Sequence, residues 1–124
     1  MIEHRTASIF LSDQGFVWFK YKNDSYISLE DSQEYVKIID EICGGVKRCF
    51  VLDSRGVFVT SSSEHRHFMG ANPEALKWRK ADAILIDQLP NRILSNYYKN
   101  FFSKNHPIQI FNEEETAVKW LLTF

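Results

Sequence analysis

The chain has 124 residues, of which 44% are hydrophobic and 15% aromatic, and this is enough apolar material for one domain with a continuous core. Its formal net charge of -1 gives no global reason to bind nucleic acid or an anionic membrane, and no apolar run approaches the ~20 residues of a membrane span. We therefore expect a single domain over residues 1–124, located in the cytoplasm, with neither nucleic-acid binding nor membrane insertion.

The first part of the chain predicts a hairpin followed by a capped helix. Two β-rich runs at residues 7–11 and 16–21 flank the turn residues Ser12 to Gly15, which is typical of an antiparallel hairpin. Ser28, with an acid three residues later, then opens a helix whose apolar residues recur at helical spacing until Gly44. We therefore expect the chain to begin antiparallel and to continue with this helix.

Strands and helices alternate through the rest of the chain. The runs Cys49-Phe-Val-Leu-Asp53 and Ala83-Ile-Leu-Ile-Asp87 are short, apolar and end in an acid, as buried parallel strands do. The other expected elements are a helix at 64–69, a short helical piece after Asn72-Pro73, a helix from Leu89 that ends before Pro107, a strand at 108–111 and a final helix capped by Asn112. This order predicts an α/β fold with a mostly parallel sheet of about five strands, an N-terminal antiparallel hairpin and four to five helices.

Apolar spacing predicts which faces of the last two helices are buried. In the helix from Leu89 the inward stripe is Ile93, Leu94, Tyr97, Phe101 and Phe102. In the final helix it is Ala117, Trp120, Leu121 and Phe124. We expect the ring of Trp120 to cover the sheet near Phe111, and truncation of a buried tryptophan to alanine costs ~3 to 5 kcal/mol.

Two acids end neighbouring strands and are the first candidates for a site. Asp53 and Asp87 are expected at one edge of the sheet, where paired carboxylates bind Mg²⁺ or do acid–base work. The alternative is that each carboxylate accepts hydrogen bonds from nearby loop amides. Because no histidine, cysteine nucleophile or glycine-rich phosphate loop accompanies them, we favour this alternative and predict no catalytic residue.

The histidines and cysteines predict no metal or cofactor site. His65 and His67 are two residues apart on a helix, so they point away from each other and cannot ligate one ion. Cys43 and Cys49 lack the spacing and the partner ligands of a metal or redox pair, and we interpret them as small buried apolar residues.

The charges are distributed unevenly along the chain. From residue 65 to residue 104 there are seven basic residues against three acids, a net charge of +4, which leaves -5 for the rest. Such a split favours an acidic partner or a phosphate-bearing ligand, although lysines on helices are usually solvated. Three consecutive serines, Ser61 to Ser63, precede the helix at 64–69, where free backbone N–H groups favour an anion or a serine cap.

The segment from Val51 to Ser63 resembles the phosphoacceptor region of STAS domains, the SpoIIAA-like superfamily. Asp53 and Gly56 fall on matching positions, Ser62 matches the first hydroxyl residue of the family's turn, and Ser63 matches the phosphorylated one. Ser61 and Glu64, however, replace the family's acid and glycine. We therefore predict that Ser62 or Ser63 caps the helix and that Ser63 does not accept phosphate.

Over essentially its whole length the chain also resembles small bacterial STAS/SEC14-like proteins of unknown function. These relatives share the hairpin, the capped helix and a similar C-terminal strand and helix, and carry residues similar to Arg66, Arg92 and Asn96. The resemblance implies a SpoIIAA-like fold, and with Asp53 and Asp87 these three residues form the expected interaction or anion-binding surface.

Two functions are consistent with these features. The first is a non-enzymatic protein-interaction or regulatory module that uses residues 61–69 and the helix from Pro90, with an unidentified protein partner or a second copy of the chain. The second is a small-molecule-binding domain for a lipid or an anionic ligand, as the resemblance to SEC14-like proteins implies. In both cases the chain is not an enzyme and needs no cofactor.

Overall fold

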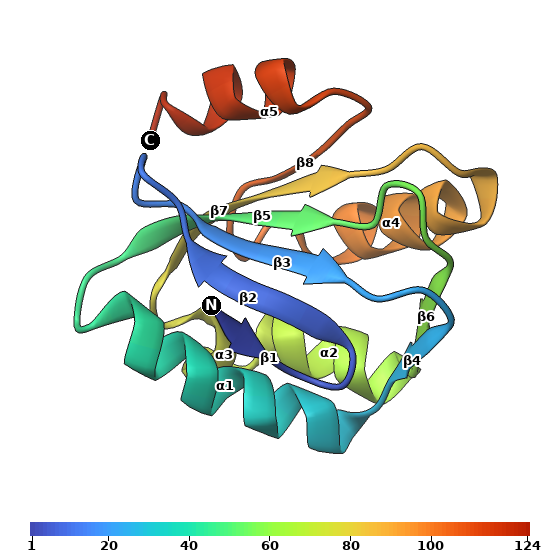
Figure 1. Ribbon diagram of the computed structural model, residues 1–124, viewed down its shortest axis with the longest axis horizontal. Coiled ribbons are helices and arrows are strands. Elements are labelled where there is room, and N and C mark those ends of the chain that lie inside the picture. Colours follow the sequence, from blue (N-terminus) through green and yellow to red (C-terminus); the bar gives the residue numbers. More distant parts are fainter.

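A computed structural model describes residues 1–124 and is built around one six-stranded sheet with the strand order β1-β2-β3-β5-β7-β8 (Figure 1). The strands in chain order are β1 (Ile2–Glu3), β2 (Ala7–Leu11), β3 (Val17–Tyr21), β4 (Ser25–Ile27), β5 (Arg48–Asp53), β6 (Val59–Ser61), β7 (Arg79–Leu85) and β8 (Ile108–Phe111). The helices are α1 (Leu29–Cys43), α2 (Ser63–Ala71), α3 (Pro73–Leu76), α4 (Leu89–Phe102) and α5 (Glu114–Leu121).

Strand pairing confirms the expected architecture. Strands β2 and β3 form the antiparallel hairpin, and β3, β5, β7 and β8 are parallel neighbours. The carboxyl ends of four strands therefore lie at one edge of the sheet, where ligands of α/β folds usually bind. The second predicted parallel strand is displaced in sequence, because β7 covers Arg79–Leu85 and ends two residues before Asp87.

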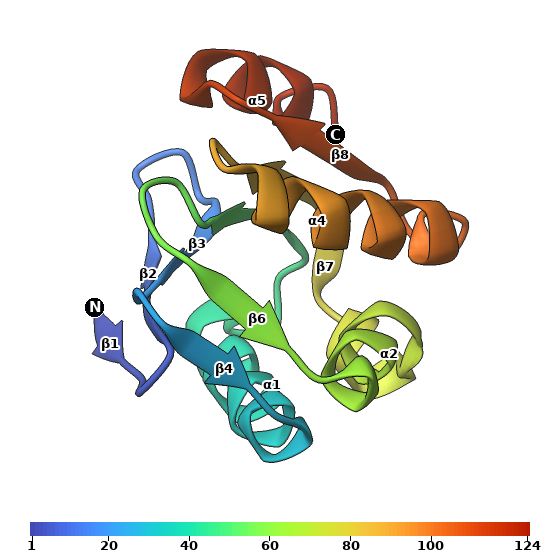
Figure 2. The ribbon, with the colours of Figure 1, turned by 90° about the vertical axis from the view of Figure 1, so that its right-hand side faces the viewer.

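Two features lie outside the predicted set of strands. The two-residue strand β1 adds an antiparallel edge beside β2. Strands β4 and β6 pair in parallel as a separate two-stranded sheet that leads directly into α2 (Figure 2). At two or three residues each, these strands are too short to show an alternating pattern in the sequence.

Helices cover both faces of the sheet. On one face α1, α2 and α3 pack on β2, β3 and β5, and the buried side chains there include Phe19, Tyr35 and Phe50. On the opposite face α5 packs alone, with Ala117 and Leu121 against β5 and β7. Figure 1 shows this three-layer arrangement, with α5 above the sheet and α1 below it. None of the helices is both long and apolar enough to cross a membrane.

Local signals place the ends of α1 as predicted, but not the start of α5. Ser28 and Asp31 form a reciprocal capping box, and α1 ends at Gly44 in the left-handed region with φ 58°. The predicted cap of the last helix is wrong: Glu113 occupies the N-cap of α5 and makes no side-chain hydrogen bond. Asn112 instead accepts a hydrogen bond from Arg92, so its side chain connects the end of β8 to α4 and does not cap α5.

The predicted inward stripe of α4 is wrong for three of its five residues. Phe102 is buried, whereas Ile93, Tyr97 and Phe101 are exposed by more than half. The buried face instead carries Asn91 and Tyr98, because the side of α4 that packs on β7 and β8 is the one with Tyr98 and Phe102. The buried amide of Asn91 is stabilised by hydrogen bonds to two loop carbonyls, which apolar spacing cannot reveal.

The predicted face of α5 is correct for Ala117 and Leu121 and only partly correct for Trp120. Trp120 does pack against Phe111, with ring centroids 5.7 Å apart, but it is half-buried. Phe124, expected to face inward, is 46% exposed because it lies beyond the end of the helix. A half-buried ring contributes less than the ~3 to 5 kcal/mol of a core tryptophan.

Candidate functional site

A cavity of about 130 Å³ lies between the sheet and the helices α1, α2 and α4. Twelve of its twenty lining residues are hydrophobic, including Phe19, Ile39, Phe50, Leu52 and Ile84. None of the lining residues is an aspartate or a glutamate. The cavity is therefore an apolar space without a negative charge in its wall.

Arg66 brings a partly free guanidinium group to this cavity. It lies in the first turns of α2, and its Nη1 donates hydrogen bonds to the carbonyl oxygen of Ser61 at 2.6 Å and to its Oγ at 3.0 Å. The Nε atom is buried and has no partner, and no protein group accepts a hydrogen bond from Nη2. No carboxylate lies within ion-pair distance of this side chain. One edge of the guanidinium is thus fixed by Ser61, while the Nε–Nη2 edge is free.

Arg79 also lines the cavity, but its donors are fully used. Its guanidinium is buried, pairs with both carboxylate oxygens of Asp82, and donates to the carbonyl oxygens of Met69 and Ala75. Its Nη2 also donates to the hydroxyl of Tyr98 at 3.2 Å. Arg79 therefore holds the fold together at this position and has no hydrogen left for a ligand.

The carboxylate of Asp82 has a second polar neighbour, His106, whose Nε2 lies 3.0 Å away. Burial by itself would raise the pKa of Asp82, but the charge of Arg79 and the hydrogen bond from His106 outweigh it and lower the pKa to about 2. Sequence reasoning missed this network entirely. The one available signal is the charged pair Arg79 and Asp82 in a strand whose other residues, apart from the exposed Lys80, are apolar.

His65 contributes a neutral imidazole to the cavity wall. Its Nδ1 forms a short hydrogen bond with Oγ of Ser32, and its ring meets Tyr35 edge-on at 5.8 Å. Burial lowers the pKa of His65 from 6.5 to about 4, and the charges of Arg79 and Arg66 act in the same direction. At neutral pH this side chain therefore adds no charge to the site.

Tyr21 also lines the cavity and keeps accessible surface. Burial nevertheless raises the pKa of its phenol well above the ordinary value. This combination is expected of a side chain that faces an internal space rather than bulk water. Its hydroxyl makes no hydrogen bond to another protein group, so it is available to a ligand.

The serines at the start of α2 have different roles. Ser62 is the N-cap, and its side chain accepts a hydrogen bond from the backbone N–H of His65 at 3.0 Å. Ser63 is the first helical residue, is exposed, and donates from Oγ to the carboxylate of Glu64 at 2.9 Å. Of the two serines expected to cap the helix, the cap is therefore Ser62.

Asp53 and Asp87 both order the loop after β5. The buried carboxylate of Asp53 accepts from the backbone N–H and the guanidinium of Arg55, with distances of 2.9 to 3.0 Å. Asp87 accepts from the backbone N–H of Gly56 at 2.9 Å, and Gly56 has the left-handed φ of 73° that suits glycine. Each acid thus accepts hydrogen bonds from a loop amide, which is the role favoured from the sequence.

Arg92 and Asn96 do not join Arg66. Both lie on α4, but neither lines the cavity. Arg92 donates to Asn112, and Asn96 is exposed without a side-chain hydrogen bond. The structure therefore divides the expected anion-binding surface, and only Arg66 borders the cavity.

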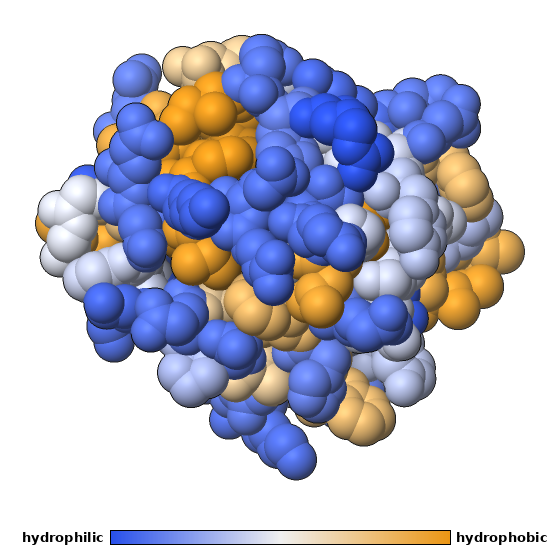
Figure 3. Space-filling view, turned by 90° about the horizontal axis from the view of Figure 1, so that it is seen from below, coloured by the Kyte–Doolittle hydropathy of each residue, from blue (hydrophilic) through white to orange (hydrophobic).

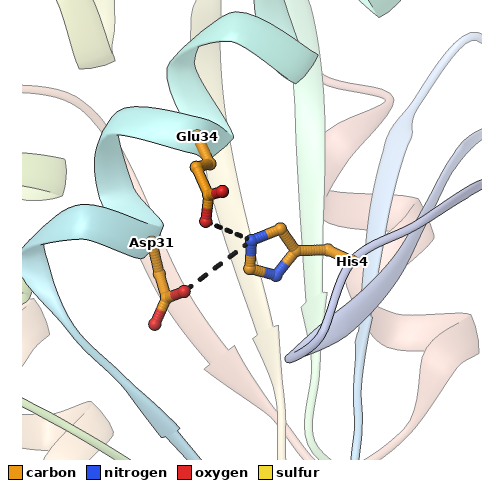
Figure 4. Close-up of side chains that lie close together, drawn as sticks. All are labelled: His4, Asp31 and Glu34. Atoms are coloured by element: carbon orange, nitrogen blue, oxygen red, sulfur yellow. Dashed lines mark hydrogen bonds and ion pairs between the residues drawn. The ribbon is translucent and has the colours of Figure 1, made fainter.

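His4, Asp31 and Glu34 form a second polar cluster, at the N-terminal part of α1 (Figure 4). The backbone N–H of Thr6 donates to Nδ1 of His4 at 3.1 Å, so this nitrogen carries the lone pair. Nε2 then carries the proton and donates to Glu34 at 3.0 Å. Since a metal would require the lone pair on Nε2, this arrangement is a hydrogen-bond network that ties the chain after β1 to α1.

A wider groove of about 720 Å³ lies outside the cavity, between α2, the start of α1 and the end of α4. Its apolar lining includes Phe68, Tyr97 and Phe101. Arg66 is the one residue that borders both the groove and the inner cavity. The exposed His67 also lines the groove, with its ring against Phe102.

The element order and the sheet topology define a SpoIIAA-like fold. The crystal structure of an uncharacterized protein of the DUF3478 family from Shewanella loihica PV-4, described as having a SpoIIAA-like fold, matches with a TM-score of 0.64. The match covers 98% of both chains at 16% identity, so it confirms the expected fold and concerns the fold alone.

Within this fold, the chain belongs to the family described as "Domain of unknown function (DUF7793)", whose model matches residues 9–124. A search of curated proteins finds no match. Neither the family nor the solved structure names a ligand or a reaction, and a shared fold does not fix a function, so the site itself indicates what the protein can bind.

Proposed function

We propose that this chain is a non-enzymatic binding domain that holds a small anionic molecule at the cavity beside α2. The observation that carries the proposal is the free Nε–Nη2 edge of Arg66 at an apolar cavity whose wall has no acidic residue. A buried donor without an acceptor costs free energy, and an anion bound there would remove that cost. This is the second of the two functions expected from the sequence.

The arrangement of the titratable groups supports a binding role rather than catalysis. Asp53 and Asp87 direct their carboxylates at the loop after β5, and Asp82 is paired with Arg79. His65 is neutral and hydrogen-bonded to a serine that does not line the cavity. No nucleophile and base therefore converge on the space where a ligand would lie.

The test is a titration of isotope-labelled protein with small apolar anions and their neutral analogues, followed by NMR. We expect the anions to shift amide resonances of α2, β5 and β7, and the Arg66→Gln variant to lose the preference for anions. Arg92→Gln is the matched control, because Arg92 does not line the cavity. If no member of the panel perturbs these resonances, the binding function is wrong.

A second candidate is an interaction module that pairs with another copy of the chain through α4. The exposed residues Leu89, Ile93, Tyr97 and Phe101 follow one another at intervals of four, with exposures of 55% to 68%. Such spacing places them along one side of the helix, and exposed apolar stripes are typical of interfaces. Seen from below, the surface is largely hydrophilic and its hydrophobic residues form separate patches (Figure 3).

Sedimentation analysis over a range of concentrations distinguishes this candidate. We expect a dimer whose dissociation constant rises in a Tyr97→Ser, Phe101→Ser variant, while Lys37→Ser leaves it unchanged because Lys37 is exposed on α1 and not on α4. A chain that remains monomeric at millimolar concentration would exclude self-association through α4.

A further inference from the structure

The size of the cavity limits what can enter it. Its volume is about 130 Å³, whereas pockets for drug-sized ligands measure ~300 to 1,000 Å³. An apolar cavity of ~150 Å³ accommodates benzene. The space beside Phe19, Phe50 and Ile84 therefore suits a single ring or a short branched chain, and excludes a nucleotide or a long acyl chain.

The hydrogen-bond donors in the cavity wall limit which charged group the ligand can carry. Arg79 has no free hydrogen and His65 is held neutral among apolar neighbours, so Arg66 is the one cation of the wall that remains open to a ligand. Its free edge presents two parallel N–H groups, which match the two oxygens of a carboxylate. One uncompensated positive charge pairs best with one negative charge, and Glu64 in the adjoining groove opposes a second.

The position of Arg66 fixes the orientation of such a molecule. Arg66 borders both the cavity and the outer groove, so its guanidinium lies where the two spaces meet. A charged group bound there stays near water, while the apolar body extends inward among aromatic and aliphatic side chains. Tyr21 also lines the cavity, and its hydroxyl could give a ligand one further hydrogen bond.

We propose that the ligand is a single-ring monocarboxylate, with its ring in the cavity between α1, α2 and the sheet and its carboxylate on the Nε–Nη2 edge of Arg66. This inference rests on the proposed function and narrows it to one class of anion. It accounts together for the small volume, the apolar wall, the lack of acids and the single free edge.

The decisive experiment compares probes that differ in one feature, using the full chain and NMR titration. Benzoate tests the class, benzamide keeps the shape without the charge, phenyl phosphate doubles the charge, and octanoate replaces the ring by a long chain. We expect benzoate to bind most tightly and benzamide about tenfold more weakly, since charge-assisted bidentate hydrogen bonds account for the difference. These comparisons need no variant, so they do not depend on how a substitution affects folding.

Variants then locate the carboxylate. Arg66→Lys keeps the charge but not the paired N–H edge, so benzoate affinity should fall while benzamide affinity stays the same. Arg92→Gln should change neither. Tighter binding of octanoate than of benzoate would overturn the single ring, and tighter binding of phenyl phosphate would overturn the single charge; either result rejects a single-ring monocarboxylate and leaves an anion-binding domain standing. Binding of none of the anions would overturn both proposals, and equal binding of benzoate and benzamide would show that Arg66 does not select charge.

Discussion

The buried imidazole of His65 predicts that the protein loses stability in mildly acidic solution. The residue is 8% exposed, and its Nδ1 is hydrogen-bonded to Oγ of Ser32. Burial, together with the nearby charges of Arg79 and Arg66, lowers the pKa of His65 from 6.5 to about 4, while the charge of Asp31 acts in the opposite direction. The unfolded chain therefore binds a proton at this residue more readily than the folded protein.

The sign and size of the effect follow from this difference. Between pH 6.5 and pH 4 the unfolded state holds more protons, so the free energy of unfolding falls as the pH falls through this window. This contribution to the free energy of unfolding is fully present above pH 6.5. It is completely lost below pH 4, where the loss amounts to about 3 kcal/mol. By pH 5 about 2 kcal/mol is lost, which is a large part of the ~5 to 15 kcal/mol that stabilises a domain.

Urea unfolding at pH 7 and pH 5 measures this contribution. We expect the free energy of unfolding of the natural protein to fall by about 2 kcal/mol more than that of the His65→Gln variant, which cannot take up the proton. His67→Gln is the control, because His67 is exposed and should leave the pH dependence unchanged. An identical pH dependence in the natural protein and His65→Gln would refute the reasoning.

Three further predictions concern packing, the buried ion pair and the helix cap, and each is measured by chemical denaturation. Gly70→Ala should lower the free energy of unfolding by about 1 to 3 kcal/mol, because the added Cβ would meet the ring of Phe102; an unchanged midpoint would mean that α2 and α4 are not packed this closely. Asp82→Asn should cost about 3 to 5 kcal/mol by leaving the guanidinium of Arg79 buried without its countercharge, and a loss below about 1 kcal/mol would contradict that account. Ser62→Ala should cost about 0.5 to 2 kcal/mol, whereas the same change at the next residue should be nearly silent.

Features set by neighbouring residues were predictable from the sequence. The hairpin follows from two β-rich runs around turn residues, and the limits of α1 follow from Ser28 and Gly44. In each case the residues that contact one another are only a few positions apart in the sequence. The contact can therefore be predicted from the residue types and their spacing. The alternation of these elements then restricts the topology to a mostly parallel sheet.

The faces of α4 were not predictable in this way. Ile93, Tyr97 and Phe101 repeat at helical spacing and are apolar, yet they are exposed. Spacing reports only that apolar residues share one side of a helix, and not whether another element covers that side. Asn91, a polar residue in the buried face, is satisfied by carbonyl groups of the loop after β5, more than thirty residues earlier in the chain.

The buried network of Arg79 was also beyond sequence reasoning. Its acceptors come from β7 itself, from the backbone of α2 and α3, and from Tyr98 on α4. Only their combination makes a buried guanidinium stable. The same network explains why Arg79, although it lines the cavity, leaves the binding of an anion to Arg66.

The small β4–β6 sheet accounts for the geometry of Arg66, although its strands are only three residues long. Pairing with β4 holds Ser61 at the end of β6, and Ser61 accepts both hydrogen bonds from Nη1 of Arg66. Because one edge of the planar guanidinium is fixed in this way, the direction of the opposite, unpaired edge is fixed as well. A pair of strands with no detectable sequence pattern thus positions the group on which the proposed binding site depends.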